Sequence, residues 1–281
     1  MRNTYKTLSL VIILISVFSS CNKKGCTDPM SLSYNIEASK DDGSCAYPKV
    51  AKKTLVFQST GTWCAYCGDW GKDFSDNVTS DYSSNVQIIQ LHNNDNFSVD
   101  VGYSMQSYLD GINGSVGVPH FYVGSAGVDN SYSLLSAAID ADVALSPEVN
   151  LAINYIVNSD SSKMNINVHS KLSNGFSGDN CYLAVYVLED GQIFEQNILG
   201  NYDPDYVHNN ILRTEASGSG SAFGVPIVFN STGDNIKSYN DIILAPSNLW
   251  NYNNLYVVAV IWEKTGNEYR FVNLFRPEAI N

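Results

Sequence analysis

Two cysteines three residues apart, Cys64 and Cys67, are the residues whose types and spacing could carry chemistry in this chain. They lie in the segment TGTWCAYCGDW, where Trp63 directly precedes the first cysteine. A pair with this spacing can be a redox centre, half of a metal site or a structural disulfide. A zinc site needs a second ligand pair, and the chain has no other Cys-x-x-Cys motif and no closely spaced histidine pair. We therefore expect no metal or other cofactor at this pair, with a copper carrier that uses both thiolates and one histidine as a weaker alternative. Redox chemistry and a structural disulfide stay open.

A strand, a loop and a helix would position such a pair for redox chemistry. The apolar run Leu55–Phe57 predicts a buried strand before the pair, and apolar residues spaced four apart predict a helix over residues 68–80. Unpaired N–H groups and the positive dipole end of a helix lower the pKa of a nearby thiol. We expect Cys64 to attack as a thiolate at the start of this helix and Cys67 to resolve the mixed disulfide.

The remaining patterns divide the chain into an α/β part and an all-β part. Strand and helix patterns alternate at residues 85–92, 103–110, 117–124 and 131–145, which indicates an α/β domain over residues 51–146. After Pro147, eight short strand-like runs are separated by turn residues and show no helical pattern. This pattern of short strands and turns predicts an antiparallel β-sandwich of the immunoglobulin-like type over residues 147–281.

Residues 1–20 have the pattern of a bacterial export signal. Arg2 and Lys6 precede the apolar run Leu8–Phe18, which is too short to span a bilayer. Two serines and Cys21 follow, and they resemble the lipobox of bacterial lipoproteins. The resemblance implies cleavage before Cys21 and acylation of this cysteine; an ordinary signal peptide with an incidental cysteine is the alternative. The N-terminal lipid would be the membrane attachment, because no later apolar run is long enough to span a membrane.

Residues 21–50 form a loop-like segment with Cys26 and Cys45 near its ends. An export signal implies an oxidising compartment, so we expect a Cys26–Cys45 disulfide and a buried free thiol at Cys181. Acidic residues of the segment could bind Ca²⁺ through their oxygens or could simply be solvated, and no complete twelve-residue calcium loop is present. These residues are Asp28, Glu37, Asp41 and Asp42.

The distribution of charge argues against nucleic-acid binding and indicates which side of the outer membrane the protein faces. The net charge of −12 provides no basic surface for nucleic acid. Asn22, Lys23 and Lys24 follow the expected lipid anchor with no early acidic run. Acidic residues directly after the anchor would resemble a surface-export signal. Because the sequence has no acidic run there, it favours the periplasmic side of the outer membrane over the cell surface.

The order strand, Trp-Cys-x-x-Cys, helix, strand, helix, then Gly-Val-Pro and a strand resembles the thioredoxin fold. The resemblance implies that Pro119 forms a cis peptide bond with Val118 and faces the cysteine pair. It would help a substrate strand to pair beside Cys64, with Trp63 packed next to it.

Two residues depart from the thioredoxin pattern. Gln58 stands six residues before the first cysteine, where thioredoxins usually have a buried acid, and Gly68 stands where a proline often follows the second cysteine. Gln58 cannot accept a proton, and Gly68 would loosen the start of the helix. We therefore expect thiol chemistry with slow turnover.

The combination of lipobox, T-G-x-W-C-x-x-C and Y-V-H-N-x-x-L-R resembles the thioredoxin-like outer-membrane lipoproteins typified by the twenty-eight-kilodalton outer membrane protein. The resemblance covers roughly residues 50–280 and implies a lipid-anchored envelope protein, without implying a definite activity. His208 and Arg213 lie in the second motif, where Arg213 could bind a ligand carboxylate or form a buried ion pair. His120, next to Pro119, could be a charge partner of the cysteine pair or an ordinary strand residue.

From these observations we expect a lipid-anchored thiol–disulfide oxidoreductase that acts on exported protein thiols and disulfides. The alternative is a non-catalytic outer-membrane binding lipoprotein in which Cys64–Cys67 is a structural disulfide. The sequence leaves the redox direction and the oligomeric state open.

Overall fold

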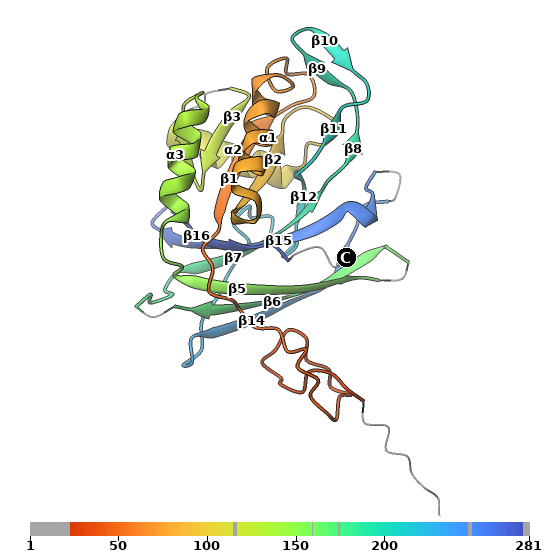
Figure 1. Cartoon of the computed structure of the whole chain (residues 1–281), viewed down its shortest axis with the longest axis vertical. Helices are drawn as coiled ribbons and strands as arrows, with labels where there is room; N and C mark the ends of the chain where they lie inside the picture. The colour runs from red at the N-terminus through yellow and green to blue at the C-terminus, as the bar shows by residue number, and fades with distance from the viewer. Residues whose placement is uncertain (1–22, 115–116, 159, 174, 247–248, 278–281) are drawn as a thin grey trace, which may run out of the picture.

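The computed structural model describes residues 23–277, apart from 115–116, 159, 174 and 247–248. The export signal and Cys21 lie outside the described residues. Within the part of the chain that the structure describes, no helix is long and apolar enough to cross a membrane. The fold is mixed α/β and rich in strands (Figure 1).

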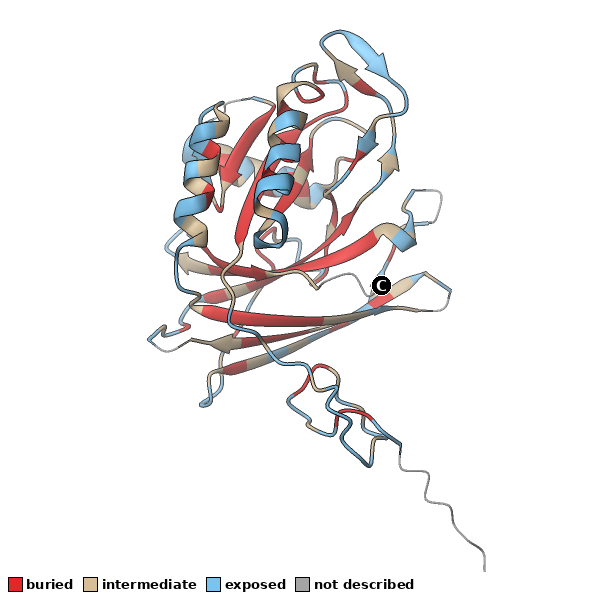
Figure 2. Ribbon diagram, in the orientation of Figure 1, coloured by how far each residue is buried: buried red, intermediate tan, exposed pale blue. Residues whose placement is uncertain are grey.

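The first part of the chain is a sheet covered by helices on both faces. Its elements are β1 (Thr54–Thr60), α1 (Trp70–Tyr82), the 3-10 turn η1 (Ser83–Asn85), β2 (Val86–His92), α2 (Asp100–Asn113), β3 (His120–Val123), β4 (Ala126–Val128) and α3 (Tyr132–Val143). Strand β1 pairs in parallel with β2 and antiparallel with β3. Val56 packs with residues of α1 and α3 on one face, and Leu55 and Phe57 pack with α2 on the other. Burial on both faces explains why Leu55–Phe57 of β1 form a continuous apolar run (Figure 2).

The second part of the chain is built from longer antiparallel strands and several short ones. Its strands are β5 (Val149–Val157), β6 (Lys163–Leu172), β7 (Cys181–Glu189), β8 (Gln192–Ile193), β9 (Gln196–Ile198), β10 (Asn201–Asp203), β11 (Val207–His208), β12 (Ile211–Glu215), β13 (Val225–Pro226), β14 (Asp234–Ile243), β15 (Leu255–Thr265) and β16 (Glu268–Phe275), with the 3-10 turn η2 (Tyr252–Asn254) before β15. The sheet β14-β6-β5 packs against β7, β15 and β16 through one apolar core. These facing strands form two layers at the base of the molecule (Figure 1).

One sheet runs through both parts of the chain. Its order is β16-β15-β7-β12-β2-β1-β3-β4, so β12 of the second part lies beside β2 of the first. The two strands run parallel and pair at Ile211 and Gln90. The core also crosses from one part to the other, because the rings of Phe57 and Trp262 stack with their centroids 6.3 Å apart. The expected boundary near residue 146 is therefore crossed by hydrogen bonds and by apolar packing.

Residues 190–208 form an excursion that the sequence patterns did not predict. Strands β8 and β11 pair with each other, and β9 and β10 form a hairpin at the far end. Figure 1 shows this hairpin beside the N-terminal end of α1, away from the rest of the second part. Strands of two or three residues are too short to leave a periodic pattern, which explains why no strand could be predicted for residues 192–207.

The N-terminal segment contains the expected disulfide between Cys26 and Cys45, with their Cα atoms 4.8 Å apart. The side chain of Asn154 donates to the carbonyl of Leu32 at 3.2 Å, which ties the segment to β5. Among the described residues, no group of three or more histidines, cysteines or acids is placed to hold a metal ion. Cys181 is a buried free thiol, and burial raises its pKa to about 12.

Candidate active site

The Cys64–Cys67 disulfide lies in the loop between β1 and α1. Its Cα atoms are 5.2 Å apart, and the Cys67 N–H donates to the Cys64 carbonyl at 3.2 Å, which closes a turn around the pair. Helix α1 begins at Trp70 rather than at residue 68. The prediction that Cys64 stands at the start of the helix was therefore wrong, because a series of turns separates the two. The positive end of the helix acts on Cys64 over a longer distance than expected.

Both sulfur-bearing residues are buried, whereas the aromatic residues beside them are exposed. Cys64 is 5% exposed and Cys67 3%, compared with 47% for Trp63 and 57% for Tyr66. The indole N–H of Trp63 donates to the Asn93 carbonyl at 2.7 Å, which holds the ring to the loop after β2. Exposed aromatic rings therefore lie next to the buried cysteines in the chain.

Pro119 lies on the other side of the disulfide. Its peptide bond with Val118 is cis, and the Val118 carbonyl oxygen is 3.6 Å from the Cys64 sulfur. A Cβ on Gly71 would come within 3.0 Å of the Pro119 ring, so α1 approaches this proline closely. The fold thus brings Trp63, Cys64, Cys67 and Pro119 together from two distant segments, as the sequence predicted.

Gln58 is buried in β1, and both the nitrogen and the oxygen of its side-chain amide are hydrogen-bonded. Its side-chain N–H donates to the Gly71 carbonyl at 3.1 Å. Its side-chain oxygen accepts from the Ser75 hydroxyl at 2.7 Å and from the Gln90 amide at 3.0 Å. This network links β1, α1 and β2, and it continues through Gln90 to the imidazole of His92, whose Nε2 lies 3.3 Å from the Gln90 side-chain oxygen. Gln58 itself has no group that takes up a proton.

The β9–β10 hairpin packs along the cysteine loop. The backbone N–H of Asn197 donates to the Thr62 carbonyl at 2.8 Å, and that of Leu199 donates to the Ala65 carbonyl at 3.2 Å. The buried side chain of Gln196 donates to the Cys64 carbonyl at 3.0 Å. The second part of the chain therefore holds the backbone on both sides of the first cysteine.

Gly68 makes this contact sterically feasible. A Cβ at this position would lie 2.7 Å from the Asn197 carbonyl oxygen and 2.8 Å from the side chains of Gln196 and Ile198. Such distances are far shorter than van der Waals contacts, so a larger residue would push the hairpin away. The glycine that departs from the thioredoxin pattern accommodates the hairpin.

Asp95 anchors the start of the cysteine loop from the opposite side. Its carboxylate accepts from the Thr62 N–H at 2.9 Å and lies 2.7 Å from Nδ1 of His92. Burial opposes ionisation, but the hydrogen bonds from His92, Thr62 and Phe97 outweigh it and lower the pKa of Asp95. The loop is thus held between this carboxylate and the hairpin.

The three remaining sequence candidates are buried. Nε2 of His208 lies 3.2 Å from the Phe194 carbonyl, and burial together with nearby His92 lowers its pKa to about 4. Arg213 is buried with Glu189 and donates to it at 2.6 Å. His120 is 7% exposed and its pKa is also lowered by burial. Arg213 therefore matches the buried-pair interpretation rather than an open carboxylate site.

Sequence reasoning missed the residues that hold the loop, Asp95, Gln196 and Asn197. Asp95 follows β2 within a few residues, and acids after a strand are a recognisable signal for a site at that end of the sheet. Gln196 and Asn197 lie more than a hundred residues from the cysteines, and nothing in their local sequence marks them.

Comparisons with known proteins agree with the fold. The structure is similar to HBP35 of Porphyromonas gingivalis, with a TM-score of 0.67, 15% sequence identity and coverage of 82% of this chain and 76% of that one. At this identity the likeness concerns the fold alone. A domain of the outer membrane lipoprotein Omp28 from Porphyromonas gingivalis matches 46% of this chain and 86% of its own, with 17% identity and a TM-score of 0.31. No curated protein sequence matched the chain.

The sequence profile of the family described as outer membrane protein Omp28 matches residues 106–275. The match confirms the resemblance to this outer-membrane family, and the cysteine pair lies before its first residue. Because the match spans more than half of the sequence, the chain belongs to the family of outer membrane protein Omp28.

Proposed function

We propose that this chain is a lipid-anchored protein of the outer membrane whose thioredoxin-like first part carries out thiol–disulfide exchange on exported proteins. The observation that carries the proposal is the Cys64–Cys67 disulfide, which lies between β1 and α1 with the Val118 carbonyl and Pro119 beside it. In this proposal the second part is an immunoglobulin-like sandwich that supports the cysteine loop and selects the partner.

The exchange proceeds in two balanced steps. A thiolate of the partner attacks the Cys64 sulfur, the Cys64–Cys67 bond breaks, and Cys67 leaves as a thiolate. A second partner thiolate then attacks its own mixed disulfide, so the partner becomes oxidised and Cys64 is released. The reverse sequence, started by the Cys64 thiolate, reduces a partner disulfide with the same bonds and electrons.

Burial of both cysteines favours a second candidate, a binding lipoprotein in which the disulfide is purely structural. The reduction potential of the pair separates the two. A value above about −270 mV supports exchange, and a value below about −300 mV supports a structural bridge.

A trapping experiment tests exchange directly. The Cys67→Ser variant retains the Cys64 thiol and lacks the resolving one, so it should accumulate mixed disulfides with envelope proteins. Cys64→Ser should trap far less, and Cys181→Ala in either background should change nothing, because that thiol is buried and its raised pKa keeps it protonated. Absence of trapped proteins together with no reduction of insulin would rule exchange out.

The lipid anchor and its side of the membrane are tested separately. Cells fed an alkyne fatty acid should label the wild-type chain, and Cys21→Ser should abolish the label. Protease added to intact cells should leave the protein uncut if it faces the periplasm, as its sequence after Cys21 suggests. Digestion in intact cells would place it on the surface instead.

A further inference from the structure

Strand β2 is paired along its whole length on one side and at a single residue on the other. All seven of its residues have partners in β1. On the opposite side, the ladder with β12 consists of the pair Gln90 and Ile211 among the described residues. Before Ile211 the chain turns away, since Val207 and His208 pair with β8. A wedge-shaped gap therefore opens in the sheet beside the first half of β2.

Alternation along β2 identifies the backbone groups that face this gap. The Gln90 N–H points to the β12 side, where it donates to the Asn210 carbonyl at 2.8 Å. Every second residue of a strand directs its N–H and C=O to the same side. Ile88 therefore faces the gap, whereas Ile89 faces β1. The Ile88 carbonyl accepts from the Gln87 side chain at 2.5 Å, and its N–H has no strand opposite it.

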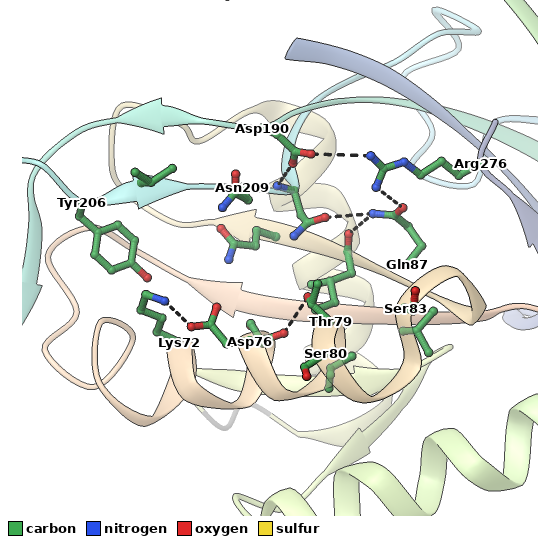
Figure 3. A pocket seen from close by; sticks show the side chains of 17 residues that line it. Lys72, Asp76, Thr79, Ser80, Ser83, Gln87, Asp190, Tyr206, Asn209 and Arg276 are labelled. Carbon is green, nitrogen blue, oxygen red and sulfur yellow. Dashed lines mark hydrogen bonds and ion pairs between the residues drawn. The ribbon is translucent and has the colours of Figure 1, made fainter. Parts of the chain in front are cut away.

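A cavity of about 460 Å³ occupies the gap. Exposed Thr79 of α1 lies along one wall, and Tyr206 and Asn209 lie along the other (Figure 3). Arg276 closes one end, where its guanidinium lies 3.7 Å from the Asp190 carboxylate. The volume is within the range of roughly 300–1,000 Å³ that is usual for ligand sites.

The lining supplies groups that suit a peptide backbone. The lining includes the side-chain amides of Gln87 and Asn209 and the hydroxyl of Tyr206 (Figure 3). The charged groups at its two ends are already paired, Lys72 with Asp76 and Arg276 with Asp190. A hydrogen-bonding channel whose charged groups are paired with one another, beside a free strand edge, favours an extended peptide, whose own N–H and C=O groups alternate with the same period as β2.

We propose that this gap binds an extended segment of another protein, which adds as a short strand to the free edge of β2 and pairs with the backbone of Ile88. The segment would lie between α1 and residues 206–210, in continuation of β12. This site is separate from the cysteine pair and does not depend on thiol–disulfide exchange.

The experiment uses the purified mature chain and a phage-displayed library of random dodecapeptides. A selected peptide is synthesised, its affinity is measured by calorimetry, and amide hydrogen exchange is followed by NMR. The peptide should slow exchange of the Ile88 amide, which has no opposite strand, and leave the Ile89 amide unchanged, because that amide already pairs with β1.

Two matched variants test whether the peptide binds in this gap. Thr79→Trp fills the gap from an exposed position on α1 and should weaken peptide binding by at least about tenfold. Asn77→Trp, exposed on the same helix but outside the cavity lining, should change the affinity by less than about twofold.

Four outcomes would overturn the proposal. The library could yield no binder, the bound peptide could leave Ile88 exchange unchanged, or Thr79→Trp could bind as tightly as Asn77→Trp. Protection of the Ile88 amide by chitohexaose but by no peptide would also overturn it, because the ligand would then be a glycan.

Discussion

At the scale of single residues, the candidate site is distinguished by buried polar groups with defined partners. The side-chain nitrogen of Gln58 donates to the Gly71 carbonyl, and its side-chain oxygen accepts from Ser75 and Gln90. An amide can make both kinds of hydrogen bond, whereas an ionised carboxylate can only accept and would leave the Gly71 carbonyl without this donor. This geometry gives a physical reason for glutamine at a position where thioredoxins usually have an acid.

The Gln58→Glu variant should be destabilised in a pH-dependent way. Only a protonated carboxyl can donate to the Gly71 carbonyl, so folding should raise the pKa of Glu at this site. Stability is then retained below the ordinary carboxyl pKa of about 4 and is lost as pH rises through the folded pKa. Urea unfolding should show a loss of about 1–3 kcal/mol at pH 8 and a smaller loss at pH 5. Equal losses at both values would contradict the burial argument.

His208 should make the protein sensitive to mild acid. Its folded pKa of about 4 lies below the ordinary histidine value of 6.5, because burial and His92 disfavour the charged form. Between these values the unfolded chain binds a proton that the folded chain does not, so stability falls as pH drops from about 6.5 to about 4. His208→Gln, which can still donate to the Phe194 carbonyl, should have a flatter profile in chemical denaturation. The same slope in both proteins would show that His208 is not responsible.

At the scale of elements, the β9–β10 hairpin is the feature that most alters the cysteine loop. It donates hydrogen bonds to the Thr62 and Ala65 carbonyls and lies against Gly68. Strand β1, helix α1 and Pro119 assemble the cysteine site, and the hairpin is hydrogen-bonded to the backbone of its loop. We expect displacement of this hairpin to make the buried disulfide more accessible to a thiol or a reductant.

Gly68→Ala should release this hairpin. The added Cβ would overlap the Asn197 carbonyl at 2.7 Å, so the hairpin must shift, at a cost of about 1–3 kcal/mol. Reduction of the disulfide by a phosphine, followed by mass spectrometry, should become faster.

Gly111→Ala is the matched control. A Cβ at Gly111 on α2 meets nothing within 4 Å, so this change should stabilise the helix by about 0.5–1 kcal/mol without altering the reduction rate. Equal reduction rates in the two variants would show that the hairpin does not shield the disulfide.

At the scale of the whole molecule, the continuous sheet makes the two parts of the chain mutually dependent. Strand β12 covers part of the β2 edge, and Trp262 stacks on Phe57 across the junction. The apolar core of the α/β part includes Tyr186 and Leu212 from the second part. Separation of the parts would expose this surface, so we expect them to unfold together.

Ile166→Ala tests this coupling at a distance. Ile166 is fully buried in β6, in the core of the second part, and its truncation should cost about 2–5 kcal/mol. Hydrogen exchange should show the same loss of protection at Leu91 in β2 and at Val258 in β15. A loss confined to Val258 would show that the two parts unfold independently.

The cysteine pair, the strand before it and the alternation of strands and helices up to residue 145 could be predicted from the sequence. These features depend on residues that are close together in the chain, so the spacing of cysteines and apolar residues in the sequence predicts them. Buried β1 reads as an apolar run because helices cover both its faces, and Pro119 could be related to Cys64 through a resemblance that extends across several elements. The sequence also showed that Gln58 and Gly68 depart from the thioredoxin pattern, although it did not show which residues contact them.

Only the tertiary structure decided how the second part of the chain meets the first. The contacts of Gln196 and Asn197 with the cysteine loop and the pairing of Ile211 with Gln90 join residues more than a hundred positions apart. Strands as short as β8–β11 carry no periodicity, and a strand edge left open by a turn has no signature in the residues that form it. The sequence thus predicted a cysteine pair that serves either in redox chemistry or as a structural disulfide. The packing of distant segments determined how deeply this pair is buried and where the sheet stays open.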